Sequence, residues 1–145
     1  MKISFDLDDL LIPGSKRFET LKQSWVQRFF RLAKIRTGTK HLFKTLRANG
    51  HLIAIYTTSL RSITTIKFTF ACYGIPIDDV INKQKHDKRL SKTDWKSSKY
   101  PPAFGIDIHI DDSPGVRIEG EKYNFRTVII EEQDSNWVES VLDQI

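Results

Sequence analysis

The chain has 145 residues, with 39% hydrophobic and 28% charged side chains and a formal net charge of +5 at pH 7. These values are typical of one globular domain with its own apolar core, and they exclude collagen-like and disulfide-rich classes. No apolar run is long enough to span a bilayer, and a single cysteine, Cys72, excludes an intrachain disulfide and a cysteine-rich zinc site. A strand follows Met1 directly, so we expect no signal peptide and a cytoplasmic protein without a membrane partner.

Apolar segments alternate between strand-like runs and helix-like spacing, which predicts an α/β fold with a mostly parallel sheet. Apolar residues recur every three or four positions from Phe18 to Ile35, as on one face of an amphipathic helix. Residues 82–100 are polar, lysine-rich and aperiodic, so we expect a long loop there. The elements expected are strands at 2–6, 52–56, 80–81, 106–110 and 127–130, helices at 18–35, 39–49 and 63–73, a turn at 113–115, and a final helix capped by Ser135.

Carboxylates follow two of these strands, namely Asp6, Asp8 and Asp9 after the first, and Asp111 and Asp112 after the fourth. Like charges at this spacing repel each other, and a hard cation such as Mg²⁺ would offset that repulsion. For Asp6, Asp8 and Asp9 taken alone, the alternative is a solvated acidic turn. Parallel strands end at one edge of a sheet, so we expect both groups to lie near the hydroxyls of Thr57 and Thr58. A helix N-terminus at that edge would hold an anion, and phosphate fits there.

Three segments resemble the haloacid dehalogenase superfamily in their order and in their places at strand ends. They are Phe5-Asp6-Leu7-Asp8-Asp9-Leu10-Leu11, Ile55-Tyr56-Thr57-Thr58-Ser59-Leu60-Arg61 and Ile110-Asp111-Asp112-Ser113-Pro114. The last two are similar to the RNA-polymerase C-terminal-domain phosphatase branch. The resemblance implies a single three-layer, Rossmann-like domain over 1–145, whose short helical insert at 12–37 takes the place of a cap. It also implies an Mg²⁺-dependent phosphatase with an aspartyl-phosphate intermediate.

The resemblance implies a role for each matching residue. Asp6 would be the nucleophile and a metal ligand, while Asp8 would be the general acid and base and would bind the metal through its carbonyl. Asp112 would complete the metal site with Asp111 as an auxiliary carboxylate, and Thr57 and Thr58 would bind phosphate. Asp9 is assigned only to the turn.

The superfamily also has a lysine that bridges nucleophile and phosphate, and the loop at 82–100 offers several. We choose Lys99, with Lys96 as the alternative, because Pro101 and Pro102 would direct Lys99 toward the strand that ends in Asp111. Leu10 departs from the family, which usually has Thr or Val there. That position supports the loop, so we expect little effect on activity.

The expected partner is a phosphorylated substrate: a small molecule, a nucleotide or a phosphoprotein. Seven basic residues lie between positions 12 and 37, and Glu19 is the only acidic residue there. These charges could attract nucleic acid, or they could simply form a solvated helix face. The aromatic residues Phe18, Trp25 and Phe29 keep helical spacing, so we expect them to pack inward. A non-catalytic phosphate- or protein-binding module is the alternative from another functional class.

Overall fold

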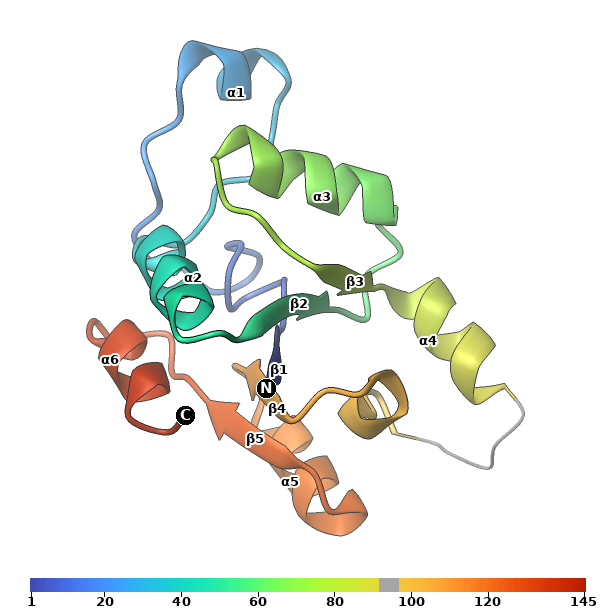
Figure 1. Ribbon diagram of the computed structural model, residues 1–145. Helices are drawn as coiled ribbons and strands as arrows, with labels where there is room; N and C mark the ends of the chain where they lie inside the picture. Colours follow the sequence, from blue (N-terminus) through green and yellow to red (C-terminus); the bar gives the residue numbers. More distant parts are fainter. Residues whose placement is uncertain (92–96) are drawn as a thin grey trace.

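The computed structural model describes residues 1–91 and 97–145. Within these residues a five-stranded, all-parallel sheet has the order β3-β2-β1-β4-β5. Its strands are β1 (Lys2–Phe5), β2 (Leu52–Tyr56), β3 (Asp79–Ile81), β4 (Ile108–Asp111) and β5 (Arg126–Ile129). The helices are α1 (Trp25–Phe29), α2 (Thr39–Ala48), α3 (Ile63–Cys72), α4 (Lys83–Leu90), α5 (Pro114–Tyr123) and α6 (Trp137–Leu142), with a 3-10 turn at Pro101–Phe104. Helices flank the sheet (Figure 1), which confirms the predicted three-layer α/β fold.

Side chains alternate across the central strands, so the main apolar core covers one face of the sheet. The other, more polar face also holds a smaller apolar cluster of Ala54, Tyr56, Ile81 and Ile106. Phe5 belongs to the main core, where helices α2, α3 and α6 cover the sheet. Ser4 and His109 are register partners on β1 and β4, and both are fully buried on the opposite face. Because successive strand side chains point to opposite faces, Asp6 and Asp111 follow Ser4 and His109 on that polar face. The alternation of side chains along β1 and β4 therefore places Asp6 and Asp111 on the same face of the sheet.

The main core forms where aromatic rings of two helices meet β1. The Phe5 ring centre lies 4.7 Å from that of Phe43 on α2, and Phe43 stacks on Phe70 of α3 with ring centres 6.4 Å apart. Burying each of these side chains contributes roughly 2 to 3 kcal/mol. This packing gives the carboxyl ends of the strands a rigid support.

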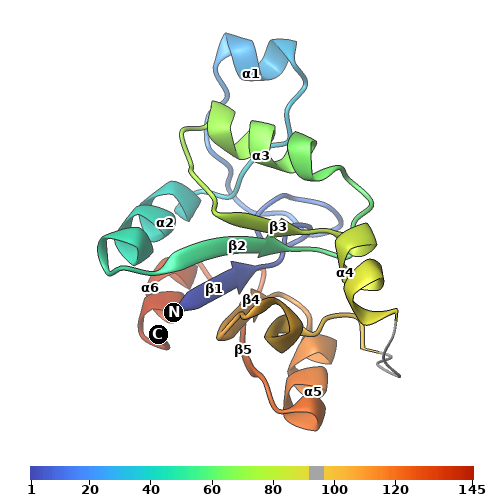
Figure 2. The same ribbon diagram turned by 45° about the vertical axis from the view of Figure 1, so that its right-hand side comes forward.

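The predicted helix over 18–35 is wrong: only α1, five residues long, is helical there. The amide of Leu21 donates to the carbonyl of Ile35, so the two legs of the insert run side by side at its base. Apolar residues on two separate legs produced the three-to-four spacing that one long helix would have. Figures 1 and 2 both show α1 projecting beyond the sheet beside α3.

Hydrogen bonds join the insert to the end of α3. The side-chain amide of Gln27 donates to the carbonyl of Cys72 at 2.9 Å, and that of Gln23 donates to the Tyr73 hydroxyl at 2.9 Å. The same hydroxyl donates to the carbonyl of Ala33 at 2.9 Å. The insert is therefore fixed against α3.

The C-terminal half holds more helix than expected. The predicted loop at 82–100 contains α4, whose first turn is capped by Asn82; its periodicity was hidden because only His86 and Leu90 are buried. The predicted turn at 113–115 starts α5, with Pro114 in the first helical turn, where a missing amide hydrogen costs nothing. Helix α6 follows Asn136 rather than Ser135 and has no side-chain cap. None of the helices in 1–91 and 97–145 has the length and apolarity needed to cross a bilayer.

Candidate active site

Three strand ends bring the predicted residues to one edge of the sheet. Asp6 directly follows β1, and its amide donates to the carbonyl of Ile110 on β4 at 2.8 Å. Asp111 is the last residue of β4, while Thr57 follows β2 and donates its amide to the carbonyl of Ile81 on β3. Since β2, β1 and β4 are neighbours, the two carboxylates and the threonine share the carboxyl edge, where ligands bind in open α/β sheets.

Lys99 lies between the two buried carboxylates. Its Nζ contacts Oδ1 of Asp6 and lies 2.5 Å from Oδ2 of Asp111, with all three side chains almost entirely buried. Burial opposes a charge on Lys99, but the charges of Asp6 and Asp111 outweigh it, so the pKa of the lysine is raised. This is the lysine that the sequence analysis chose. The alternative, Lys96, lies outside the described residues.

Neighbouring segments hold Lys99 in place. The amide and hydroxyl of Ser98 both donate to the carboxylate of Glu119 on α5, at 2.8 and 2.7 Å. The amide of Tyr100 donates to the hydroxyl of Tyr56 at 2.8 Å, and that hydroxyl also bonds Nδ1 of His86 at 2.5 Å. The lysine is thus anchored on both sides before the 3-10 turn begins.

His109 connects Asp111 to the middle of the sheet. Its Nε2 lies 2.9 Å from Oδ2 of Asp111, and its Nδ1 lies 2.7 Å from the hydroxyl of Ser4. Burial, together with the charge of Lys99, lowers the pKa of His109 to about 4, so the ring is neutral at pH 7. A carboxylate only accepts, so Nε2–H donates to Asp111, which leaves Nδ1 to accept from Ser4.

The pKa values of the two carboxylates that contact Lys99 are shifted in opposite directions. Burial alone would raise the pKa of Asp111, but the hydrogen bond from His109 and the charge and hydrogen bond of Lys99 hold it well below its ordinary value. The amide of Ser113 also donates to Asp111, at 2.9 Å. Burial raises the pKa of Asp6 to about 7; the charge of Lys99 opposes that rise, and Asp111 and Asp112 add to it. Asp6 therefore carries negative charge that the surrounding protein does not fully balance.

The acidic cluster has the chemistry of a hard-cation site. Carboxylate oxygens of Asp6, Asp111 and Asp112 lie within 4.8 Å of one another. Oxygen-only donors suit Mg²⁺, and the raised pKa of Asp6 indicates a position where a cation would be stabilised. Asp111 already accepts three protein hydrogen bonds. Within residues 1–91 and 97–145, the carboxylate of Asp112 pairs only with the partly exposed Lys16, at 2.7 Å. Asp6 and Asp112 thus fit an ion better than Asp111 does.

Asp8 and Asp9 differ in their surroundings. The Asp8 carboxylate is partly exposed and lies 2.5 Å from Nη1 of Arg61, and none of the backbone hydrogen bonds of the turn uses its carbonyl. Asp9 has φ 66° and accepts hydrogen bonds from the Gly14 amide, the Ser15 hydroxyl and the Lys16 amide. Slight burial favours its neutral form, but these bonds outweigh that effect and lower the pKa of Asp9. Asp9 therefore closes the turn, and Asp8 faces outward.

The remaining predicted residues show fewer contacts. The hydroxyl of Thr57 is buried and accepts from the amide of Ser59 at 3.0 Å, while Thr58 is exposed. Leu10 is fully buried in the main core, as a loop-supporting residue should be. The sequence patterns did not assign His109, Ser4, Lys16 or Arg61 to the site. Strand alternation alone would have placed His109 on the face of Asp111.

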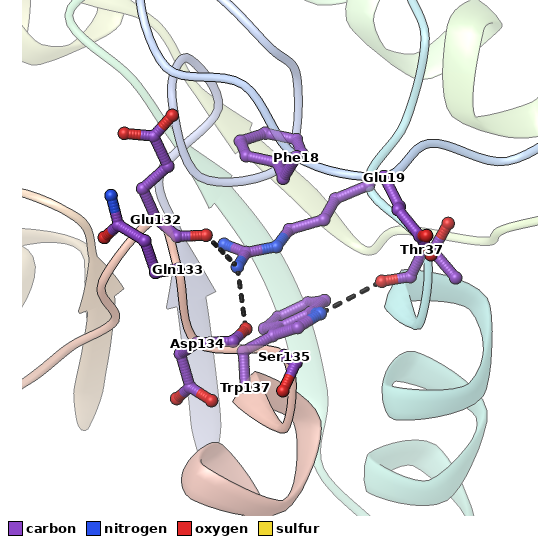
Figure 3. A pocket seen from close by; sticks show the side chains of 9 residues that line it. Phe18, Glu19, Thr37, Glu132, Gln133, Asp134, Ser135 and Trp137 are labelled. Atoms are coloured by element: carbon purple, nitrogen blue, oxygen red, sulfur yellow. Dashed lines mark hydrogen bonds between the residues drawn. The ribbon is translucent and has the colours of Figure 1, made fainter.

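A separate pocket of about 310 Å³ lies where the insert meets the segment after β5 (Figure 3). The guanidinium of Arg36 lies 4.6 Å from the Phe18 ring centre and 4.9 Å from that of Trp137. Its Nη2 donates to the carbonyls of Glu131, Glu132 and Asp134, and Nε1 of Trp137 donates to the carbonyl of Thr37 at 3.0 Å. Arg36 is almost fully buried and braces the fold through Nη2, while its buried Nη1 has no hydrogen-bond partner among the described residues.

No protein-family model matches the sequence, and no curated protein matches it. The assignment of function therefore depends on the chemistry and geometry of this site.

Proposed function

We propose that this protein is an Mg²⁺-dependent phosphatase of the haloacid dehalogenase type, which hydrolyses a phosphate monoester through an aspartyl-phosphate on Asp6. The observation that carries the proposal is the contact of Lys99 with Asp6 and Asp111 at the carboxyl edge of a parallel sheet. A buried cation beside a carboxylate of raised pKa is a combination typical of catalytic sites, and it supports the proposal.

In the first step, a carboxylate oxygen of Asp6 attacks phosphorus, and the bond from phosphorus to the ester oxygen breaks as Asp8 gives that oxygen its proton. In the second step, water attacks the same phosphorus, Asp8 takes a proton from it, and the bond to Asp6 breaks to release inorganic phosphate. Lys99 holds Asp6 in place and stabilises the charge on the phosphoryl oxygens, with the hydroxyl of Thr57 as a further donor.

Mg²⁺ would be held by Asp6, Asp112 and the carbonyl of Asp8, where it would offset the negative charge of the phosphoryl group. Lys16 would then leave the carboxylate of Asp112. Both side chains of that ion pair are partly exposed, so the exchange costs little.

The test is hydrolysis of p-nitrophenyl phosphate with and without Mg²⁺. Activity should be lost in EDTA and return with Mg²⁺. Asp6→Asn should lower kcat by at least about 1,000-fold and Asp8→Asn by about 100-fold or more. Asp9→Asn is the matched control: the Asn oxygen can accept from the amides of Gly14 and Lys16, and its NH2 group can donate to the hydroxyl of Ser15. Asn also tolerates the positive φ, so activity should stay within about threefold of wild type. Activity that survives Asp6→Asn would refute the mechanism.

A phosphate-binding module without turnover is the second candidate. Arg61 on Asp8 and Lys16 on Asp112 each neutralise a carboxylate that the enzyme would need. Beryllium fluoride with Mg²⁺ separates the two functions, because it forms an acyl-phosphate mimic on a competent nucleophile. A stable adduct on Asp6 favours the enzyme, and phosphate binding without an adduct favours the module.

A further inference from the structure

Four aromatic side chains on α1 and α3 face solvent, contrary to the prediction that the insert aromatics pack inward. We name them the aromatic surface: Trp25 (74% exposed), Phe29 (75%), Phe30 (55%) and Phe68 (47%). Phe30 contacts Phe29 and Phe68 edge-on, with ring centres 5.3 and 6.0 Å apart, and Trp25 stands one helical turn before Phe29. A joined aromatic group of this kind on a protein surface marks a binding surface.

The aromatic surface leads into a cavity of about 330 Å³ between the insert and α3. Phe30 forms part of its rim, and Leu7, Ile66 and Phe70 line its apolar wall. Arg61 also lines it, and the same guanidinium contacts the carboxylate of Asp8. The cavity thus connects the aromatic surface to the proposed general acid, and it is large enough for one small ring system.

Positive charge surrounds both features. Arg28 and Arg31 on the insert and Lys67 on α3 are exposed beside the aromatic rings, and Arg31 lines the cavity. Helix α3 contains no acidic residue, and Glu19 is the only acidic residue between positions 12 and 37. The ligand that fits must therefore be anionic and must carry flat rings at short intervals.

We infer that the aromatic surface and cavity bind single-stranded nucleic acid, with its terminal base in the cavity and its terminal phosphate directed to Asp6. Flanking bases stack on Phe30, Phe29 and Trp25, and the basic side chains contact the backbone phosphates. A phosphorylated peptide would satisfy the charges but leave most of these rings without partners. The use of this strand as a substrate rests on the proposed phosphatase function, whereas its binding does not.

The test is the affinity of a fluorescent, end-phosphorylated eight-nucleotide strand, measured by anisotropy with the Asp6→Asn protein in EDTA. Trp25→Ala and Phe30→Ala should each raise Kd about fivefold or more, because each removes a stacking platform. Arg28→Ala should make the slope of log Kd against log salt shallower by about 0.7, the value for one phosphate contact on a single strand. Each of these side chains is exposed, so circular dichroism should show an intact fold.

Matched controls lie on α5, on the opposite side of the molecule in both views (Figures 1 and 2). Ile118→Ala removes an apolar side chain of similar exposure, and Lys122→Ala removes an exposed positive charge. Both should leave Kd for the strand within about twofold of the parent, since neither adjoins a stacked base.

Three results would overturn the inference: no binding of the strand, equal effects from surface and control variants, or tighter binding of a phosphopeptide or of a mononucleotide than of the strand. Hydrolysis of p-nitrophenyl phosphate by the unmodified protein is scored separately. If the aryl phosphate is hydrolysed but the strand does not bind, the inference fails alone. If the strand binds as expected but no phosphate ester is hydrolysed, the proposed phosphatase fails and the binding surface stands.

Discussion

Asp6→Asn should stabilise the protein while abolishing its proposed activity. Burial raises the pKa of Asp6 from 3.8 to about 7 even with Lys99 in contact. Above pH 7 the carboxylate is ionised in both folded and unfolded states, and the folded state pays for the raised pKa by up to about 4 kcal/mol. Asn has nearly the same shape and can still accept from Lys99, and Asp111 keeps that lysine paired.

The sign of the pH dependence follows from the raised pKa. Below pH 3.8 the carboxyl is neutral in both states and costs nothing; between pH 3.8 and about 7 only the unfolded state ionises, so wild-type stability falls as pH rises. The advantage of Asp6→Asn should therefore be near zero at pH 4 and reach a few kcal/mol at pH 8. Urea unfolding in EDTA, followed by tryptophan fluorescence to which the buried Trp137 contributes, measures the difference.

Asp79→Asn is a control of opposite sign. Burial works against the charge of Asp79, but hydrogen bonds from Lys85 and Lys2 prevail and lower its pKa. Its stabilising contribution is present above the unfolded pKa and is lost as pH falls, so this variant should be less stable than wild type at pH 8. A loss of stability in Asp6→Asn at pH 8, or a gain that does not change with pH, would refute the electrostatic account of the site.

Two further variants test the buried network. Lys99→Met leaves Asp6 and Asp111 as adjacent buried carboxylates, so the free energy of unfolding at pH 8 should fall by about 3 to 5 kcal/mol. The control Lys83→Met breaks only the exposed pair with Asp87 and should cost less than about 0.5 kcal/mol. Similar losses in the two variants would contradict the burial argument. His109→Phe keeps an aromatic ring but leaves Ser4 and Asp111 without their hydrogen-bond partner. The free energy of unfolding in the same urea assay should fall by roughly 2 to 4 kcal/mol. A loss below about 1 kcal/mol would contradict the importance of these hydrogen bonds.

The sheet and the strand-end carboxylates were predictable because both depend on short-range rules. An apolar run buried on both faces indicates a parallel strand, and parallel strands share a carboxyl edge, so Asp6 and Asp111 were expected together. Lys99 was selected because Pro101 and Pro102 follow it, and the structure places its amino group on both carboxylates. Its chemical role, like the roles of Asp8 and Thr57, stays a prediction.

The insert was not predictable from its apolar spacing. Trp25 and Phe29 match a buried helical face in sequence, yet both are largely exposed, because the insert is held by the polar contacts of Gln23 and Gln27 with the end of α3. Spacing reports which residues share a face of a helix, and it does not report whether anything covers that face. The same limit hid α4, since eight mostly polar residues leave no apolar pattern to read.

The central place of β1 imposes an order on how the protein is made. Residues 2–5 are made before both of their pairing partners, residues 52–55 on one side and residues 108–110 on the other. Such distant pairings form late in folding, because closing a long loop costs entropy before the contacts stabilise it. Asp6 therefore meets Lys99 and Asp111 only after the chain between them has been made. A nascent chain thus carries Asp6 well before the buried cluster of Asp6, Lys99 and Asp111 can form.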